Sequence, residues 1–141
     1  MKMLITGVTG FIGNYLASQF PEAKSISHND CDLTDWDEVL KFDWEGGVIV
    51  NCAHVGKYRE DKEGNLEKNI KLLANLRRRW PRAKIINFGS GAMFDKSGPI
   101  VKAKENDIAY PTDLYGLSKR MTVDVADVTL IIFGLFSNLV L

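Results

Sequence analysis

The sequence has few of the features that would place a protein in a membrane, in an oxidising compartment or on a nucleic acid. It has two cysteines, Cys31 and Cys52, whose spacing fits neither a metal site nor a redox motif. We expect both to be buried free thiols in a reducing compartment, and we expect no metal site. No apolar run is long enough to span a bilayer, and we expect no leader peptide before the first apolar segment.

Charge of one sign is also missing, because 18 basic residues balance 18 acidic ones. A net charge of zero leaves no basic footprint for a nucleic acid or for an anionic membrane surface. We therefore predict a cytoplasmic protein that has no nucleic-acid partner and no membrane partner. The hydrophobic content of 45% and the length of 141 residues fit one compact domain over 1–141.

What the chain does contain is a regular alternation of strand-like and helix-like segments. Short apolar or β-branched runs predict strands at 3–5, 24–27, 48–50, 84–88 and 129–136. Apolar residues at helical spacing predict helices at 11–20, 34–40, 66–80 and 113–125. Asp35 with Glu38 forms a capping pair for the second helix, and a long surface loop is expected over 95–111. This order predicts an α/β fold, a doubly wound parallel sheet with helices on both faces.

A glycine-rich loop lies between the first strand and the first helix. Gly7, Gly10 and Gly13 allow a tight turn, a close approach to a pyrophosphate and tight packing of the helix. The start of that helix offers unpaired N–H groups and a positive dipole end to phosphates. The alternative is a simple turn in which the glycines serve only the backbone geometry.

The run Thr6-Gly-Val-Thr-Gly-Phe-Ile-Gly13 resembles the extended branch of the short-chain dehydrogenase/reductase family, the NAD-dependent epimerases, dehydratases and reductases of nucleotide-sugars. The resemblance implies a Rossmann NAD(P)-binding fold whose cofactor loop is made by Gly7, Thr9, Gly10, Phe11, Ile12 and Gly13. The resemblance spans this chain but only the N-terminal half of the family's members, so we expect a domain truncated before the C-terminal substrate domain.

Further positions match the same family. An Asp followed by an aliphatic residue is typical beside the adenine ring, which implies this role for Asp32 and Leu33. The segment Cys52-Ala53-His54 would line the cofactor with backbone; we interpret His54 as a loop residue beside the nicotinamide ribose, with a catalytic histidine as the alternative. Asn69 either orders the cofactor side of the sheet or is a polar residue on a solvated helix face.

The candidate catalytic residues are Ser90, Tyr115 and Lys119, and the resemblance implies that Tyr115 and Lys119 also contact the cofactor. Tyr115-Gly-Leu-Ser-Lys119 is a Tyr-x-x-x-Lys motif, and residues four apart share one face of a helix. Ser90 follows a predicted strand, in a segment that ends in Phe94 like the family's segment with a catalytic hydroxyl. The alternatives are that Ser90 only caps a turn and that Tyr115 and Lys119 form a solvent-facing pair.

The resemblance implies a mechanism in which proton transfer is coupled to hydride transfer. A tyrosine with a pKa of about 10 is a poor base at neutral pH, but a nearby ammonium stabilises its phenolate. Lys119 would supply that charge and bind the ribose, and Ser90 would hold the substrate oxygen. The acids Asp30 and Asp32 after the second strand, where no Arg is present, favour NAD over NADP as the cofactor.

The short length leaves two classes of function open. One is an enzyme, or part of an enzyme, that modifies a nucleotide-sugar by reduction, epimerisation or dehydration. The other is a catalytically idle NAD(P)-binding or assembly module, which retains Tyr115 and Lys119 without a substrate site. The resemblance also implies a homodimer through the helices at 66–80 and 113–127.

Overall fold

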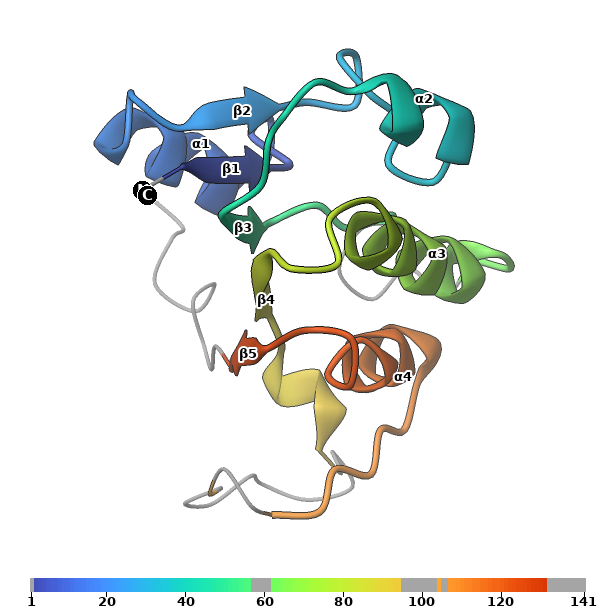
Figure 1. Ribbon diagram of the computed structural model, residues 1–141. Coiled ribbons are helices and arrows are strands. Elements are labelled where there is room, and N and C mark those ends of the chain that lie inside the picture. Colours follow the sequence, from blue (N-terminus) through green and yellow to red (C-terminus); the bar gives the residue numbers. More distant parts are fainter. Residues whose placement is uncertain (1, 57–61, 95–103, 105–106, 132–141) are drawn as a thin grey trace.

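The computed structural model describes residues 2–56, 62–94, 104 and 107–131 (Figure 1). Strands and helices alternate along the chain, as the apolar pattern predicts. The elements are β1 (Met3–Thr6), α1 (Phe11–Gln19), β2 (Lys24–Ile26), α2 (Trp36–Lys41), β3 (Val48–Asn51), α3 (Asn65–Arg79), β4 (Lys84–Phe88), the short 3-10 helix η1 (Gly91–Met93), α4 (Leu114–Met121) and β5 (Val128–Leu130).

The five strands form one parallel sheet in the order β2-β1-β3-β4-β5. The chain moves one way from β1 to β2 and the other way from β3 to β5, so the direction of winding reverses beside β1. Figure 1 shows α1 on one side of the sheet and α2, α3 and α4 on the other. The predicted doubly wound α/β fold is confirmed, and the reversal places a crevice at the carboxyl ends of β1 and β3.

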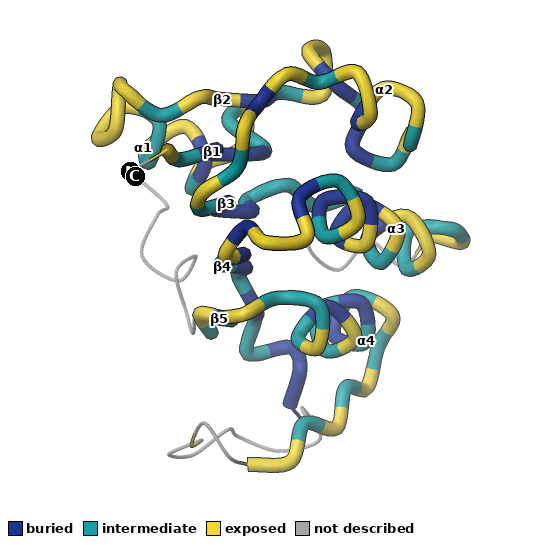
Figure 2. The backbone as a smooth tube through the Cα atoms, viewed as in Figure 1, coloured by how far each residue is buried: buried dark blue, intermediate teal, exposed yellow. Residues whose placement is uncertain are grey.

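The main core lies between the sheet and α3. Leu4, Ile49 and Ile85 stand in register on β1, β3 and β4 and are fully buried. Leu73 and Leu76 project from α3 onto them at helical spacing and belong to the same cluster. Figure 2 shows this inner stripe of α3 as buried, while its outer turns are exposed. This packing holds the ends of β1, β3 and β4 at fixed positions under the loops that follow them.

Two details of the helix ends differ from the expectations. The Asp35 side chain caps α2 by accepting from the amides of Asp37 and Glu38, but the Glu38 carboxylate accepts from the Asp32 amide instead of returning to Asp35. The helix predicted over 113–125 is too long, because α4 ends at Met121.

The early end of α4 coincides with hydrogen bonds made by Thr122, the residue that follows it. Its hydroxyl donates to the Lys119 carbonyl at 2.9 Å, and the amides of Val125 and Ala126 both turn back to the Thr122 carbonyl. The chain continues from Thr122 in turns that lead into β5. A hydroxyl that bonds a carbonyl of the preceding turn slightly destabilises a helix and often bends it.

The structure also bears on the expectations for the cysteines, for the segments 95–111 and 132–136, and for membrane-spanning helices. Cys31 is buried, but Cys52 is only half-buried, so the expectation of two buried thiols is wrong for Cys52. Most of the loop expected over 95–111 and the end of the last strand, 132–136, lie outside the described residues. Within the described part of the chain, no helix has the length and apolar character needed to cross a membrane.

Candidate functional site

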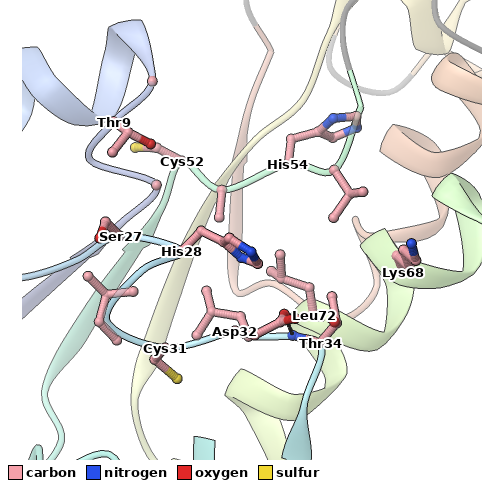
Figure 3. A pocket seen from close by; sticks show the side chains of 16 residues that line it. Thr9, Ser27, His28, Cys31, Asp32, Thr34, Cys52, His54, Lys68 and Leu72 are labelled. Carbon is pink, nitrogen blue, oxygen red and sulfur yellow. Dashed lines mark hydrogen bonds between the residues drawn. The ribbon is translucent and has the colours of Figure 1, made fainter. Parts of the chain in front are cut away.

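A cavity of about 480 Å³ opens at the carboxyl edge of the sheet, where the winding reverses. Its walls come from the loop after β1, the segment after β2, the segment after β3 and the outer side of α3. Figure 3 shows the His28 ring pointing toward the side of this cavity that holds Asp32, Thr34 and Lys68. The lining residues are Gly7, Thr9, Gly10, Ile26, Ser27, His28, Cys31, Asp32, Leu33, Thr34, Cys52, Ala53, His54, Val55, Lys68 and Leu72.

The glycine loop has a conformation that side chains would prevent. Gly7 has a φ of +69°, and a Cβ there would lie 2.6 Å from the Ala53 nitrogen. A Cβ on Gly13 would lie 2.3 Å from the Gly7 carbonyl oxygen, so α1 packs directly on the loop. Gly10 caps α1 and lines the cavity, and it brings no side-chain acceptor to the amide groups of the first turn. The loop therefore has the backbone geometry that an anionic group requires.

The two acids after β2 are both engaged in local turns. The Asp30 carboxylate accepts from the amide and hydroxyl of Ser27, and Asp30 does not line the cavity. The Asp32 carboxylate accepts from the amide and hydroxyl of Thr34 at 2.9 and 2.7 Å. Partial burial raises the pKa of Asp32, but the Thr34 bonds and the charges of His28 and Lys68 outweigh it and hold that pKa below its usual value. Of the two acids considered, the ionised Asp32 is the one that faces the cavity.

The segment after β3 is held in place by α3. The Asn69 side chain is buried; it accepts from the Val55 amide at 2.8 Å and donates to the Val55 carbonyl at 2.9 Å. Asn69 is thus not on a solvated helix face, and it orders the cavity wall made by Cys52, Ala53 and His54. Burial raises the pKa of the Cys52 thiol to about 12, so this thiol stays protonated.

The catalytic candidates Tyr115 and Lys119 share one face of α4, and His54 packs against them. The His54 and Tyr115 rings meet edge to face at 5.2 Å between centroids, and the Lys119 Nζ lies 5.9 Å from the Tyr115 ring centre. Lys119 donates to the Phe88 carbonyl at 3.0 Å, which ties α4 to the end of β4.

Burial changes the ionisation of both basic groups in this cluster. It lowers the pKa of Lys119 to about 8, so the ammonium is retained at neutral pH but is readily lost above it. Burial and the charge of Lys119 lower the pKa of His54 to about 4, so this imidazole is neutral at pH 7. The charged Lys119 therefore lies beside Tyr115, as the stabilisation of a phenolate requires.

Ser90 caps η1, with its hydroxyl accepting from the Ala92 amide at 3.2 Å. The turn-capping alternative is therefore part of its role. The same segment reaches α4, because a Cβ on Gly116 would lie 2.1 Å from the Ala92 carbonyl oxygen. Gly116 follows Tyr115 directly, so this close approach brings the Ser90 segment against the helix that carries Tyr115 and Lys119.

The structure thus separates the candidates into two neighbouring groups. Eight predicted cofactor residues line the cavity: Gly7, Thr9, Gly10, Asp32, Leu33, Cys52, Ala53 and His54. The remaining candidates lie outside its lining: Phe11, Ile12, Gly13, Asn69, Ser90, Tyr115 and Lys119. His54 joins the two groups, because it lines the cavity and also contacts Tyr115.

Sequence reasoning missed several lining residues. Ile26, Ser27 and His28 could have been found from their place at the end of β2, which is where such a cavity opens. Thr34 could have been found from its spacing to Asp32, which is that of a side chain bonding a backbone two residues on. No local signal marks Lys68, which faces the cavity only because α3 lies beside β3. Among the described residues, no group of three or more His, Cys, Asp or Glu is arranged to hold a metal ion.

The fold and the glycine loop at its switch point define a Rossmann-type α/β domain. A model of the NAD dependent epimerase/dehydratase family matches residues 3–128, and the chain belongs to this family. The resemblance inferred from the glycine loop and the Tyr-x-x-x-Lys motif is thereby confirmed.

Individual relatives are similar over most of this chain. A dTDP-4-dehydrorhamnose reductase of Mycolicibacterium smegmatis is 28% identical over 128 residues, which cover 84% of this chain and 39% of the relative. The crystal structure of a hypothetical dTDP-4-dehydrorhamnose reductase from Sulfolobus tokodaii is 26% identical with a TM-score of 0.74, covering 94% of this chain and 55% of that one.

A GDP-mannoheptose C4 reductase from Campylobacter jejuni with NADP bound has a TM-score of 0.78 at 18% identity, covering 94% of this chain and 48% of that one. At this identity the likeness shows the fold alone. The chain thus spans between two fifths and just over half of the length of these relatives.

Proposed function

We propose that this chain is the dinucleotide-binding part of an NAD(P)-dependent enzyme that reduces, epimerises or dehydrates a nucleotide-sugar. The observation that carries the proposal is the cavity at the switch point, which is lined by the glycine loop and by His54, whose ring contacts Tyr115 of the Tyr115–Lys119 pair. Its relatives, named as nucleotide-sugar reductases, support this class of substrate. A nucleotide-linked keto sugar such as dTDP-4-dehydrorhamnose is the first compound to test.

The cavity residues fit an NAD(P) cofactor. Gly10 and the first-turn amides of α1 would bind the pyrophosphate, and Asp32 with Leu33 would bind the adenosine end. His54 lines the cavity and contacts Tyr115, so it marks the side of the cavity nearest the Tyr115–Lys119 pair, where the nicotinamide ribose would be held. When bound, the cofactor supplies hydride transfer.

The chain's own residues would supply geometry and proton movement. Tyr115 would exchange a proton with the substrate oxygen, and the Lys119 ammonium would stabilise its phenolate. The Ser90 hydroxyl accepts from the Ala92 amide and can still donate its own hydrogen to the same substrate oxygen. The neutral His54 ring covers one edge of Tyr115 and adds no second charge to compete with Lys119.

We also propose that NAD is preferred over NADP. The support is the ionised Asp32 in the cavity wall, which would accept from a ribose hydroxyl and repel a 2′-phosphate. Asp32→Asn keeps an acceptor for Thr34 and removes the charge, so the ratio of NADP to NAD affinity should rise at least about fivefold. An unchanged ratio in fluorescence titrations with NADH and NADPH would contradict the preference.

The test of the proposed function is a comparison of the wild-type chain with Tyr115→Phe. Both should bind NADH or NADPH with the same affinity, because the substitution removes only the phenol oxygen, whose proposed role is proton exchange with the substrate. Turnover of a nucleotide-sugar should fall by about 10³-fold or more in Tyr115→Phe. Equal turnover would refute the catalytic assignment. Binding without turnover in the wild-type chain would favour the idle cofactor-binding module.

A further inference from the structure

Four buried polar side chains lie side by side near the carboxyl edge of the sheet. Thr6, Asn51 and Asn87 stand in register on β1, β3 and β4, and Thr122 follows the end of α4. The exposed fractions of these residues are 0, 4, 3 and 6%. Buried polar groups are costly unless they are hydrogen-bonded, so each of them needs a partner. We refer to Thr6, Asn51, Asn87 and Thr122 as the polar row.

The polar row is joined end to end by hydrogen bonds. The Thr6 hydroxyl donates to Asn51 Oδ1 at 2.6 Å, and Asn51 Nδ2 donates to Asn87 Oδ1 at 2.9 Å. Asn87 Nδ2 donates to the Thr122 hydroxyl at 3.1 Å, and that hydroxyl donates to the Lys119 carbonyl at 2.9 Å. The chain of bonds therefore crosses three strands and finishes on the backbone of the residue that stands beside Tyr115.

The groups at the two ends of the polar row determine which side chain donates and which accepts in each of its hydrogen bonds. The Lys119 carbonyl can only accept, so Thr122 must donate to it and can only accept from Asn87. At the other end the Ala53 amide can only donate, and it approaches the Thr6 hydroxyl at 3.4 Å. Turning either Asn amide around would set two donors or two acceptors against each other. A single orientation of all four side chains satisfies the whole row, and bonds arranged in this way reinforce one another.

The polar row also touches both groups of site residues. Thr6 precedes Gly7, and Ala53 is the residue against which Gly7 is packed, so one end lies at the glycine loop. The other end lies at Lys119, whose ammonium bonds the Phe88 carbonyl one residue beyond Asn87. We propose that the polar row positions α4, and with it Lys119, relative to the cofactor loop, so that Thr6, Asn51, Asn87 and Thr122 are positioning residues for the site. The catalytic purpose of this positioning rests on the proposed function, whereas the positioning of Lys119 by the polar row is independent of it.

The chain offers a matched pair of substitutions for the test. Thr122→Val removes the hydroxyl that joins the polar row to α4 and keeps the side-chain shape. Thr129 is next in register to Asn87, on β5, and its buried hydroxyl has no hydrogen-bond partner among the described residues. Thr129→Val is therefore the control, since it makes the same change at the neighbouring position without breaking the row. Thr122→Ser keeps the hydroxyl and should restore wild-type behaviour.

Two measurements on the folded chain read the position of Lys119. The first is ¹³C NMR of lysine-labelled protein, in which the Lys119 signal is assigned with the Lys119→Met variant. The pKa of Lys119 should be higher by about half a pH unit in Thr122→Val than in the wild type, because a displaced ammonium is better solvated. NADH affinity, measured by fluorescence, should fall about fivefold. Thr129→Val and Thr122→Ser should stay within about twofold of the wild type.

The results separate a positioning role from a merely structural one. If Thr122→Val is less stable but leaves both the Lys119 titration and the NADH affinity unchanged, the proposal is overturned. If Thr122→Val does not fold, Thr6→Val at the far end is measured in the same way, and an unmoved Lys119 titration there overturns it equally. If the wild-type chain binds neither NADH nor NADPH, the proposed function fails, while the Lys119 titration still decides the role of the polar row.

Discussion

At the scale of the residue, the glycine loop contains two positions with different constraints. A Cβ on Gly13 would lie 2.3 Å from the Gly7 carbonyl oxygen, whereas a Cβ on Gly10 would lie 3.3 Å from the same atom. Gly13→Ala should therefore lower the free energy of unfolding by about 1–3 kcal/mol through overpacking. Gly10→Ala should cost about 1 kcal/mol or less, as a change of cap residue.

The loss of NADH affinity should not parallel the loss of stability in Gly10→Ala and Gly13→Ala. Both variants should lose NADH affinity, Gly13→Ala because the loop is displaced and Gly10→Ala because its methyl group occupies the space of the pyrophosphate. Urea unfolding and NADH fluorescence measure the two quantities separately. A Gly10→Ala variant with wild-type affinity would show that this glycine serves only the turn.

A second prediction at this scale concerns His54 and pH. Burial and the Lys119 charge lower the pKa of His54 from 6.5 to about 4, so the folded chain resists a proton that the unfolded chain accepts. Between about pH 6.5 and pH 4 the unfolded state binds more protons, and the free energy of unfolding falls as the pH falls. The slope due to one group is at most about 1.4 kcal/mol per pH unit.

His54→Gln should flatten this acid limb, since it removes the imidazole and retains a hydrogen-bonding side chain near Ser118 and Gly56. The exposed His28 offers the matched control, because His28→Gln also removes one imidazole but keeps His54. Urea unfolding at pH 7, 6 and 5 measures the slopes. Equal slopes in His54→Gln and the wild type would rule out the contribution of His54.

Single residues also show what the sequence can and cannot predict. Gly7, Gly10 and Asp32, which line the cavity, could be predicted as site residues because the signal lies in their spacing and in their place after a strand. The partnership of Asn51 with Asn87 was not found, because it depends on the pairing of β3 with β4, 36 residues apart. The burial of Asn69 likewise depends on where α3 packs, which the local sequence leaves open.

At the scale of the element, the start of α4 decides how Tyr115 is presented. The Asp113 side chain caps α4 by accepting from the Gly116 amide at 2.6 Å, and Asp35 caps α2 in a similar way. Asp113→Ala and Asp35→Ala should each lower the free energy of unfolding by about 1 kcal/mol. Only Asp113→Ala should also weaken NADH binding, by a factor of about two to five, because α4 carries Lys119.

Asp35→Ala is thus the matched control for Asp113→Ala, because both variants should lose about the same free energy of unfolding. Asp113→Ser retains a capping oxygen and should recover most of both losses. Urea unfolding gives the stabilities and NADH fluorescence gives the affinities. An equal loss of affinity in Asp35→Ala would mean that general destabilisation, and not the start of α4, is responsible.

Where the structure describes both ends of a predicted element, its limits were predicted to within a few residues, except for the end of α4. The helix at 113–125 was expected to continue through Thr122 because apolar residues recur at helical spacing. The Thr122 hydroxyl instead bonds the Lys119 carbonyl and accepts from Asn87, which ends α4 at Met121. A tertiary contact with β4 therefore outweighs the local pattern, and no feature of 113–125 alone reveals it.

At the scale of the whole molecule, the alternation of strands and helices predicts a parallel sheet but not the order of its strands. Parallel strands joined by helices require crossovers of one hand, and a reversal beside β1 then fixes which strand ends border the cavity. Fold and site are linked in this way, because the residues of the cavity come from three loops and from α3, which the sheet brings together. The homodimer that the family resemblance implies does not follow from the arrangement of the strands, and it stays a prediction.

The prediction of a homodimer can be tested on α4. Leu114 and Met121 are seven residues apart on one stripe of this helix, and they are 41 and 44% exposed beside α3. If a second copy packs on this stripe, Leu114→Glu with Met121→Glu should place unpaired charges in the interface and shift the chain to monomers. Leu40→Glu on α2, where Leu40 is also exposed, changes surface charge away from α4 and is the matched control. Sedimentation velocity over a range of concentrations measures the mass of each variant. A wild-type chain that stays monomeric at all concentrations, or a dimer that both α4 substitutions leave intact, would exclude pairing through this face.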